Sequence, residues 1–338
     1  MKAFCILEPG RTGIVDRPGP EPGPGEVLLR VRKVGFCGSD LSTFLGRNPL
    51  ASYPRIPGHE VAAEIERAGP GVPAGARPGT PVTVVPYTSC GECAACRRGR
   101  PNACRRNETL GVQRDGAMAE FLAVPWAKVV APPRLSLTEL ALVEPLTVGF
   151  HAVDRAGIGP ADTVAVLGCG MIGLGAVAGA SRRGARVIAV DIDDAKLRTA
   201  LLAGAKHPVN SRTSALHAEI ERLTGGRGAD VVVEAAGLPS TYRAAVDEVA
   251  FAGRVVCIGY AKEEVAFATK LFVQKEIDLR GSRNAAPGDF EAAAAHLATG
   301  AFPSQAVLSR EVPLEGAAEA LAGWARDPAA ITKIVVDL

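Results

Sequence analysis

The segment that most constrains the fold runs from Val164 to Gly173, where an apolar strand leads directly into a Gly-x-Gly-x-x-Gly turn. The residues that follow, Leu174–Arg183, are compatible with a helix. A glycine pattern of this kind is weak evidence alone, but between a strand and a helix it is typical of a dinucleotide-binding βαβ unit. The segment therefore predicts a nucleotide-binding parallel sheet in the second half of the chain.

Each residue of this turn has an expected role. Gly168 permits the tight turn, Gly170 lets the backbone approach a pyrophosphate, and Gly173 permits close packing of helix and strand. The N-terminus of the helix that follows offers free N–H groups and the positive end of a helix dipole to the phosphates, and Met171 and Ile172 complete the residues predicted to bind the cofactor. These five residues form the predicted cofactor-binding turn.

The next strand ends in Asp191, eighteen residues after Gly173. An acidic residue there accepts hydrogen bonds from the ribose hydroxyls and repels a 2′-phosphate. No arginine follows at once, since the next residues are Ile192, Asp193 and Asp194. We therefore predict NAD rather than NADP. The alternative is a glycine turn that only packs, with an aspartate that caps the next helix; the agreement of strand, glycines, helix and acid favours the cofactor.

The chain has two parts that differ in residue composition and pattern. Residues 1–150 are rich in proline, glycine and short β-branched runs, which predict an irregular β-rich domain. From about residue 160, apolar strands alternate with alanine-rich helical stretches, which predicts a parallel sheet buried on both faces. The fold class is therefore α/β, with a Rossmann-type doubly wound sheet at 151–284 and a β-rich catalytic domain at 1–150 plus 285–338. The expected strands of the sheet are Thr163–Leu167, Arg186–Val190, Asp230–Glu234, Arg254–Ile258 and Ile277–Arg280. The closing strand, Lys333–Asp337, could pair with either domain.

Composition excludes several classes of function. The chain has 338 residues, a length typical of about two domains, and a net charge of +2 with scattered basic residues, so no nucleic-acid surface is expected. The N-terminal residues lack the apolar run of a signal peptide, and no 18-residue apolar stretch follows, so no membrane partner is expected. We expect a cytoplasmic protein.

Four of the eight cysteines, Cys90, Cys93, Cys96 and Cys104, lie within fifteen residues. In a cytoplasmic chain, clustered cysteines indicate a metal more often than disulfides. Four thiolates suit tetrahedral zinc with no open position, which is a structural site. An iron–sulfur cluster or unligated thiols are the alternatives; the spacing and the rest of the chain favour zinc.

Three dispersed residues, Cys37, His59 and Glu144, are candidates for a second metal site. Taken singly, each has an ordinary explanation: a buried thiol, a loop histidine and an acid at a helix start. Three protein ligands plus one exchangeable position are nevertheless what a catalytic zinc requires.

Together these residues resemble the medium-chain, zinc-dependent alcohol dehydrogenase superfamily over essentially the whole chain. The resemblance rests on the segments GFCGSD, GHE, the four-cysteine lobe, EPL and GCGMIG, in that order. Glu144, where alcohol dehydrogenases have cysteine, is similar to the sorbitol, threonine and butanediol dehydrogenase branch. Two further segments, Ser52–Arg55 and Gly281–Ala285, resemble bacterial galactonate oxidoreductases. The implied fold includes a GroES-like catalytic domain.

The resemblance also implies roles for single residues. Cys37, His59 and Glu144 would bind the catalytic zinc, with Glu60 near or on the metal as an alternative ligand. Asp40 would orient the zinc-bound histidine, and Ser39 would hydrogen-bond the substrate oxygen and pass on its proton. Two positions depart from the family pattern: Ser42 stands where many relatives have a histidine that ends the proton relay, and Ala63 stands where relatives have glycine. Phe44, Trp126 and Arg283 are candidates for the substrate pocket.

The sequence therefore predicts an oxidoreductase with one catalytic Zn²⁺, one structural Zn²⁺ and NAD, which oxidises a secondary alcohol of a polyol, sugar or sugar acid. Threonine or simple alcohol dehydrogenases are alternatives within the enzyme class. A non-enzymatic NAD-binding sensor and a zinc-free quinone or enoyl reductase are rivals on the same scaffold, and the retained cysteine and histidine disfavour both. Relatives imply a homodimer or homotetramer.

Overall fold

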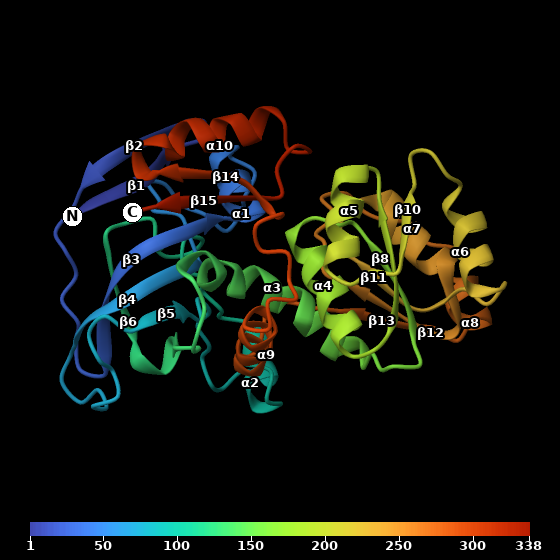
Figure 1. Cartoon of the computed structure of the whole chain (residues 1–338), viewed down its shortest axis with the longest axis horizontal. Helices are drawn as coiled ribbons and strands as arrows, with labels where there is room; N and C mark the ends of the chain where they lie inside the picture. Colours follow the sequence, from blue (N-terminus) through green and yellow to red (C-terminus); the bar gives the residue numbers. More distant parts are fainter. The chain divides into compact units, whose positions relative to one another are not determined.

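The computed structural model describes all 338 residues, which form two compact units. The first unit comprises Met1–Glu144, Ala286–Thr299 and Ser304–Leu338. The second comprises Pro145–Ala285 and Gly300–Pro303. Both termini therefore belong to the first unit, and almost all of the second unit is one continuous stretch of chain (Figure 1).

The second unit is built on a six-stranded parallel sheet with the order β10-β9-β8-β11-β12-β13. The valines and alanines of its two central strands are fully buried, as expected for a sheet covered on both faces. The strand order reverses between β8 and β11, which makes this point the topological switch where α/β folds bind ligands. The strands are β8 (Thr163–Leu167), β9 (Arg186–Asp191), β10 (His207–Asn210), β11 (Ala229–Glu234), β12 (Val249–Cys257) and β13 (Asp278–Gly281).

Helices connect these strands and pack against the sheet (Figure 1). The first of them, α4 (Met171–Arg182), contacts β8, β9 and β11, and nine of its twelve residues are buried. Its small side chains let α3 (Leu137–Ala156) approach closely, with Gly149 of α3 against the backbone of Gly175 and Ala176. The remaining helices of this unit are α5 (Asp194–Leu202), α6 (Leu216–Thr224), α7 (Pro239–Glu248) and α8 (Lys270–Gln274).

The first unit is mainly β. A seven-stranded sheet has the order β14-β15-β3-β4-β5-β7, with β6 also paired to β3, and β1 and β2 form a separate antiparallel pair. Its core includes the rings of Phe4 and Phe36, which meet edge to face at 5.9 Å. The strands are β1 (Lys2–Glu8), β2 (Arg11–Asp16), β3 (Glu26–Phe36), β4 (Glu60–Ala68), β5 (Pro81–Val84), β6 (Phe121–Pro125), β7 (Val129–Val130), β14 (Leu308–Pro313) and β15 (Lys333–Asp337).

Short helices complete the first unit. Several of them border the segments that carry candidate site residues, as described below. They are α1 (Gly38–Phe44), α2 (Ala94–Arg97), η1 (Pro101–Ala103), η2 (Trp126–Lys128), α9 (Pro287–Leu297), η3 (Leu314–Gly316) and α10 (Ala317–Arg326). None of the helices of the chain has the length and apolar composition needed to cross a bilayer.

The predicted α/β class is confirmed: one unit is built on a parallel sheet and the other is rich in β-strands. The closing strand, left open by its sequence, pairs with β3 and β14 and so belongs to the first unit. The sequence pattern missed β10, because His207–Asn210 has a single buried apolar residue and resembles a loop. The predicted start of the helix after the glycine turn was late by three residues, since α4 already begins at Met171.

Replacement of Gly149 by alanine should destabilise the second unit. The added Cβ would lie 2.2 Å from the backbone nitrogen of Ala176, which no rotamer change can relieve. Alanine gains up to about 1 kcal/mol of helix propensity, but overpacking costs about 1–3 kcal/mol. We expect a net loss in the free energy of unfolding, measured by urea denaturation. Gly159→Ala, in open space, is the matched control; equal stability of the two variants would contradict the close helix contact.

Candidate active site and metal centres

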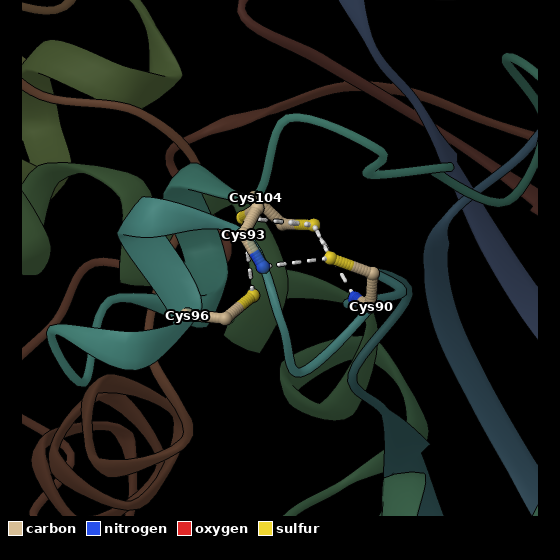
Figure 2. Close-up of side chains that lie close together, drawn as sticks. All are labelled: Cys90, Cys93, Cys96 and Cys104. Carbon is tan, nitrogen blue, oxygen red and sulfur yellow. Dashed lines mark hydrogen bonds between the residues drawn. The ribbon is translucent and has the colours of Figure 1, made fainter.

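The four clustered cysteines converge in the structure. They lie on the loop around α2 and η1, and their Sγ atoms all fall within 4.8 Å of one another (Figure 2). The measured pairs are Cys93–Cys96 at 3.5 Å, Cys93–Cys104 at 3.9 Å and Cys90–Cys104 at 3.5 Å. A disulfide requires about 2.05 Å, so these are free thiols held side by side.

This spacing fits a single tetrahedral ion. Zinc–sulfur bonds of about 2.3 Å in a tetrahedron place the sulfurs about 3.8 Å apart, close to the three measured pairs. Backbone N–H groups point at the sulfurs, including Cys93 N to Cys90 Sγ at 3.4 Å and Arg106 N to Cys104 Sγ at 3.3 Å. Backbone N–H groups at Cys96 and Arg105 lower the pKa of Cys93 to about 6. At Cys96, by contrast, burial and the neighbouring thiols raise the pKa to about 11, so the thiolate that the loop favours before any ion is bound is that of Cys93.

A second cluster joins Cys37, His59 and Glu60, whose ligand atoms also lie within 4.8 Å of one another. The register of two antiparallel strands brings them together, because Gly35 near the end of β3 pairs with Glu60 at the start of β4. Cys37 follows β3 directly, and His59 precedes β4 directly. Residues more than twenty positions apart therefore meet at one end of the β3–β4 pair.

Glu60 is almost fully buried and is held by Lys333 of β15, which is also buried. The Lys333 ammonium donates to the two Glu60 oxygens at 2.5 and 2.6 Å and to the carbonyl of Phe36 at 3.0 Å. Burial raises the pKa of Glu60 to about 7, although Lys333 lowers it. A Cβ on Gly35 would lie 1.9 Å from a Glu60 oxygen, so glycine is required there.

Asp40 binds the backbone on both sides of this cluster. Its carboxylate accepts hydrogen bonds from the N–H of Cys37 at 2.8 Å and of Gly58 at 3.4 Å. Burial raises the pKa of Asp40, while the charge of His59 and the two N–H groups lower it. Asp40 therefore fixes the segments that carry Cys37 and His59 through their main chains.

Two polar atoms of this cluster are buried without a hydrogen-bond partner: Ser39 Oγ and His59 Nδ1. Burial lowers the pKa of His59, but Cys37, Glu144 and Asp40 outweigh it and raise that pKa well above its ordinary value. Buried polar atoms normally have partners. Unsatisfied atoms beside a thiol and a carboxylate are what a missing ligand leaves.

Glu144 lies in the middle of α3, not at a helix start, and is buried. One of its oxygens accepts a hydrogen bond from the hydroxyl of Tyr87. Burial and the charge of Glu144 raise the pKa of Tyr87 well above its ordinary value. Glu144 does not share the 4.8 Å group of Cys37, His59 and Glu60, but its charge acts on His59.

The residues present fit a zinc ion with an open position. A thiol, an imidazole and a carboxylate within 4.8 Å of one another offer three zinc ligands, and Glu144 is a fourth candidate nearby. Sequence reasoning missed Tyr87 and Lys333, which hold the two carboxylates. Neither has a sequence signal, because each contacts a residue more than fifty positions away.

The glycines of the nucleotide turn differ in what surrounds them. Gly168 has a φ of +97°, and a Cβ on Gly173 would lie 1.8 Å from the carbonyl oxygen of Gly168. A Cβ on Gly170 would meet nothing within 4 Å. The fold itself therefore requires glycine at 168 and 173. At 170, the absence of a side chain leaves space that a phosphate can approach. The N–H groups of Met171 and Ile172 lie in the first turn of α4.

Asp191, the last residue of β9, is fixed against this turn. Its carboxylate accepts hydrogen bonds from the N–H of Cys169 at 2.7 Å, of Ile192 at 2.7 Å and of Asp193 at 3.1 Å. Asp193 caps α5 by accepting from Ala195 at 2.7 Å. The alternative explanation for an aspartate here was that it caps the next helix. Asp193 has that role, and the Asp191 carboxylate lies beside the glycine turn.

Two of the three candidate pocket residues contribute to the core of the first unit. Phe44 is buried in it and Trp126 packs against it. Arg283 follows β13 in the second unit.

Family models cover most of the chain. Residues 23–134 match the alcohol dehydrogenase GroES-like domain, and residues 172–299 match the zinc-binding dehydrogenase model. The chain is 35% identical to L-galactonate-5-dehydrogenase of Escherichia coli K12, over 94% of each chain. It is 36% identical to sorbitol dehydrogenase of Bacillus subtilis 168, over 83% of this chain and 81% of that protein.

Solved structures agree with these matches. A short chain alcohol dehydrogenase from Escherichia coli CFT073, complexed with NADH, superposes with a TM-score of 0.91 at 29% identity, over 100% and 99% of the two chains. A zinc-binding dehydrogenase from Sinorhizobium meliloti 1021, bound to NADP, gives 0.91 at 32% identity over the same shares. The chain belongs to the zinc-type, medium-chain alcohol dehydrogenases. Within them it falls in the branch of the sorbitol and galactonate dehydrogenases. It is an oxidoreductase, and its donor sets and fold fit zinc and NAD.

Loss of one thiol from the four-cysteine cluster should lower the thermal stability of the protein more than its catalytic activity. We expect Cys96→Ser to reduce the zinc content from two ions per chain to one, measured by atomic absorption. The thermal midpoint should fall by at least a few degrees, since loss of a bound metal is among the strongly destabilising changes and each 1 kcal/mol corresponds to about 2–4 °C. Cys257→Ser, outside both clusters, is the control and should keep both ions. Full stability and two zinc ions in Cys96→Ser would refute the structural role.

Proposed function

We propose that this protein transfers hydride from a secondary alcohol of a polyol, a sugar or a sugar acid to NAD. The first unit would carry both zinc sites, and the second unit would bind the cofactor. The observation that carries the proposal is the convergence of Cys37, His59 and Glu60 within 4.8 Å, beside a buried histidine nitrogen that lacks a partner. The substrate class is supported by relatives named for sorbitol and for L-galactonate.

The choice of NAD over NADP rests on Asp191. Similar structures hold NADH in one case and NADP in another, so likeness alone does not decide. Three backbone N–H groups hold the Asp191 carboxylate at the end of β9, where it accepts hydrogen bonds from ribose hydroxyls and repels a 2′-phosphate. The next residues, Ile192, Asp193 and Asp194, include no arginine that could bind a 2′-phosphate.

When bound, zinc stabilises negative charge on the substrate oxygen, and the nicotinamide accepts the hydride. The chain's own residues hold the reacting groups. Ser39 Oγ, buried and without a partner, is available to accept a hydrogen bond from the alcohol hydroxyl and, as it takes that proton, to release its own proton to the next group of a relay. Asp40 keeps Cys37 and His59 in place by accepting hydrogen bonds from the backbone N–H of Cys37 and of Gly58, the residue before His59. With Ser42 in place of the relay histidine of relatives, the proton path beyond Ser39 must use another group.

Two carboxylates compete for the third protein ligand position. Glu60 lies within 4.8 Å of the other two ligands, but Lys333 engages both of its oxygens. Tyr87 engages one oxygen of Glu144. We assign Cys37 and His59 as ligands in either case, with Glu144 or Glu60 as the third.

Loss of the histidine ligand should abolish turnover. We expect His59→Ala to lower kcat/KM by about a thousandfold or more, since metal stabilisation contributes several kcal/mol and each 1.36 kcal/mol is tenfold. The measurement is NAD reduction across sorbitol, aldonates, threonine and simple alcohols, with and without chelator. NADH binding, followed by fluorescence, should persist.

His217→Ala is the matched control, because that histidine is exposed and pairs only with Glu248. Normal activity in a His59→Ala protein with one zinc per chain would refute the mechanism. Failure of the zinc-loaded protein to oxidise any of the alcohols would favour a sensor.

Removal of the acid after β9 should relax cofactor choice. In Asp191→Ala, the ratio of kcat/KM for NAD to that for NADP should fall about 10- to 100-fold, the value of one or two hydrogen bonds to a charged group. Asp193→Ala, which removes the neighbouring helix cap, serves as control. An unchanged ratio in Asp191→Ala would remove the basis for the NAD assignment.

A further inference from the structure

Glu234, the last residue of β11, is a fully buried carboxylate that has no cation as partner. All of its hydrogen-bond donors are backbone N–H groups and one hydroxyl. The buried Glu60 of the first unit, by contrast, is paired with Lys333. Burial of a carboxylate without a cation is costly. Departures of this kind from the rules of protein stability are concentrated at functional sites, so Glu234 is a candidate for such a role.

One oxygen of this carboxylate, Oε1, holds the loop that connects β11 to α7. The N–H groups of Ala236 and Gly237 donate to Oε1 at 3.0 and 2.7 Å. The hydroxyl of Thr241, in the first turn of α7, donates to the same oxygen at 2.7 Å. The other oxygen, Oε2, is buried without a hydrogen-bond partner. Glu234 therefore fixes the conformation of the loop 235–238.

This loop packs against the glycine turn that is predicted to bind the pyrophosphate. The N–H of Ala235 donates to the carbonyl of Leu167, at the end of β8, at 2.9 Å. A Cβ on Gly168 would lie 3.0 Å from the nitrogen of Ala236, and a Cβ on Gly173 would lie 3.6 Å from the Cβ of Ala235. The loop therefore supports the glycine turn on the side of β11.

The same loop also packs against the segment that follows β12. A Cβ on Gly259 would lie 2.3 Å from the nitrogen of Gly237 and 2.7 Å from Glu234 Oε2, so glycine is required there. A Cβ on Gly237 would lie 3.0 Å from the backbone of Tyr260. The hydroxyl of Tyr242 donates to the carbonyl of Gly259 at 2.5 Å and fixes the segment further. Glu234 is thus the carboxylate on which the contact between these two strand ends depends.

The order of the strands relates these segments to a bound dinucleotide. Such a cofactor crosses the carboxyl edge of the sheet where the strand order reverses, with one mononucleotide half on each side. The reversal lies between β8 and β11, and Asp191, the predicted partner of the adenosine ribose, ends β9. The nicotinamide half therefore belongs to the side of β11 and β12. The loop 235–238 lies between the pyrophosphate-binding turn and the segment after β12 on that side.

We propose that Glu234 is a positioning residue for the cofactor. Its carboxylate holds the loop 235–238 in the conformation that sets the spacing between the glycine turn and the Gly259–Tyr260 segment, and that spacing admits the nicotinamide half. Glu234 does not touch the cofactor, because its side chain is fully buried. It acts through the backbone of Ala236 and Gly237. The inference rests on cofactor binding by the second unit, which is part of the proposed function.

The test compares the binding of NADH with that of AMP, which contains the adenosine half alone, to the zinc-loaded protein. In Glu234→Ala, the Kd for NADH, followed by nicotinamide fluorescence, should rise about 10- to 100-fold, the range expected for a lost hydrogen bond to a charged group. The Kd for AMP, measured by calorimetry, should stay within about twofold, because the adenosine half lies on the other side of the reversal point. Glu234→Gln keeps an acceptor at the position of Oε1 and should restore most of the NADH affinity.

Glu248→Ala is the matched control and should bind NADH as the wild type does. Glu248 is also a buried glutamate of the second unit, but it precedes β12 at the opposite edge of the sheet and contacts His217. Thr241→Val removes one donor and keeps the carboxylate. It should raise the Kd for NADH by about three- to tenfold, and it decides the question if Glu234→Ala does not fold.

Equal losses of NADH and AMP affinity would show that Glu234 only stabilises the unit and would overturn the inference. Unchanged NADH affinity in Glu234→Ala, or in Thr241→Val if the alanine variant does not fold, would also overturn it, as would a glutamine variant as weak as the alanine variant. These outcomes leave the proposed function intact, since the wild type still binds NADH. Absence of NADH binding by the wild type would instead refute the cofactor assignment on which both proposals rest.

Discussion

The buried ion pair of Lys333 with Glu60 connects three strands at the candidate catalytic centre. Lys333 comes from the C-terminal strand β15, Glu60 from the start of β4, and the carbonyl of Phe36 from the end of β3. Removing two charges from water is costly, and the removal of one partner from such a pair typically costs about 3–5 kcal/mol. The pair is tolerated because every Lys333 donor has an acceptor. It also requires Gly35, since any Cβ there would overlap the Glu60 carboxylate. The positions of Cys37 and His59 depend on this register.

Both units contain close backbone contacts at which glycine is required. Each contains segments of backbone that approach one another closely, and each uses glycines whose missing Cβ makes room. In the second unit, Gly173 meets the Gly168 carbonyl and Gly170 leaves its outer side open. In the first, Gly111 and Gly116 pack against Gly58 and so fix the turn before His59. The two metal clusters, in contrast, are built differently. The four cysteines of the lobe come from one short stretch of chain. The candidate catalytic cluster takes its ligands from segments distant in the sequence and leaves Ser39 and His59 with buried polar atoms that lack a partner.

Much of what could be predicted rested on local sequence patterns. The strand from Thr163 to Leu167 and the glycine turn after it were recognisable because the motif is contiguous and its chemistry depends on backbone conformation. The cysteine lobe was recognisable for the same reason, since four thiols within fifteen residues can reach one ion whatever the remaining fold. By contrast, β10 was missed because its four residues lack an apolar pattern, and the helix start at Met171 was misplaced because glycine-rich first turns resemble loops.

The sequence by itself determined the α/β class, the nucleotide turn with Asp191 at the end of the next strand, and the grouping of Cys90, Cys93, Cys96 and Cys104. Only the tertiary structure decided that β15 pairs with β3, that Lys333 therefore faces Glu60, and that Tyr87 reaches Glu144. The physical reason is the distance along the chain between the residues that interact. A turn or a closely spaced set of ligands is fixed by neighbouring residues. The partner of a buried charge comes from strands and loops that only the folded chain brings beside it.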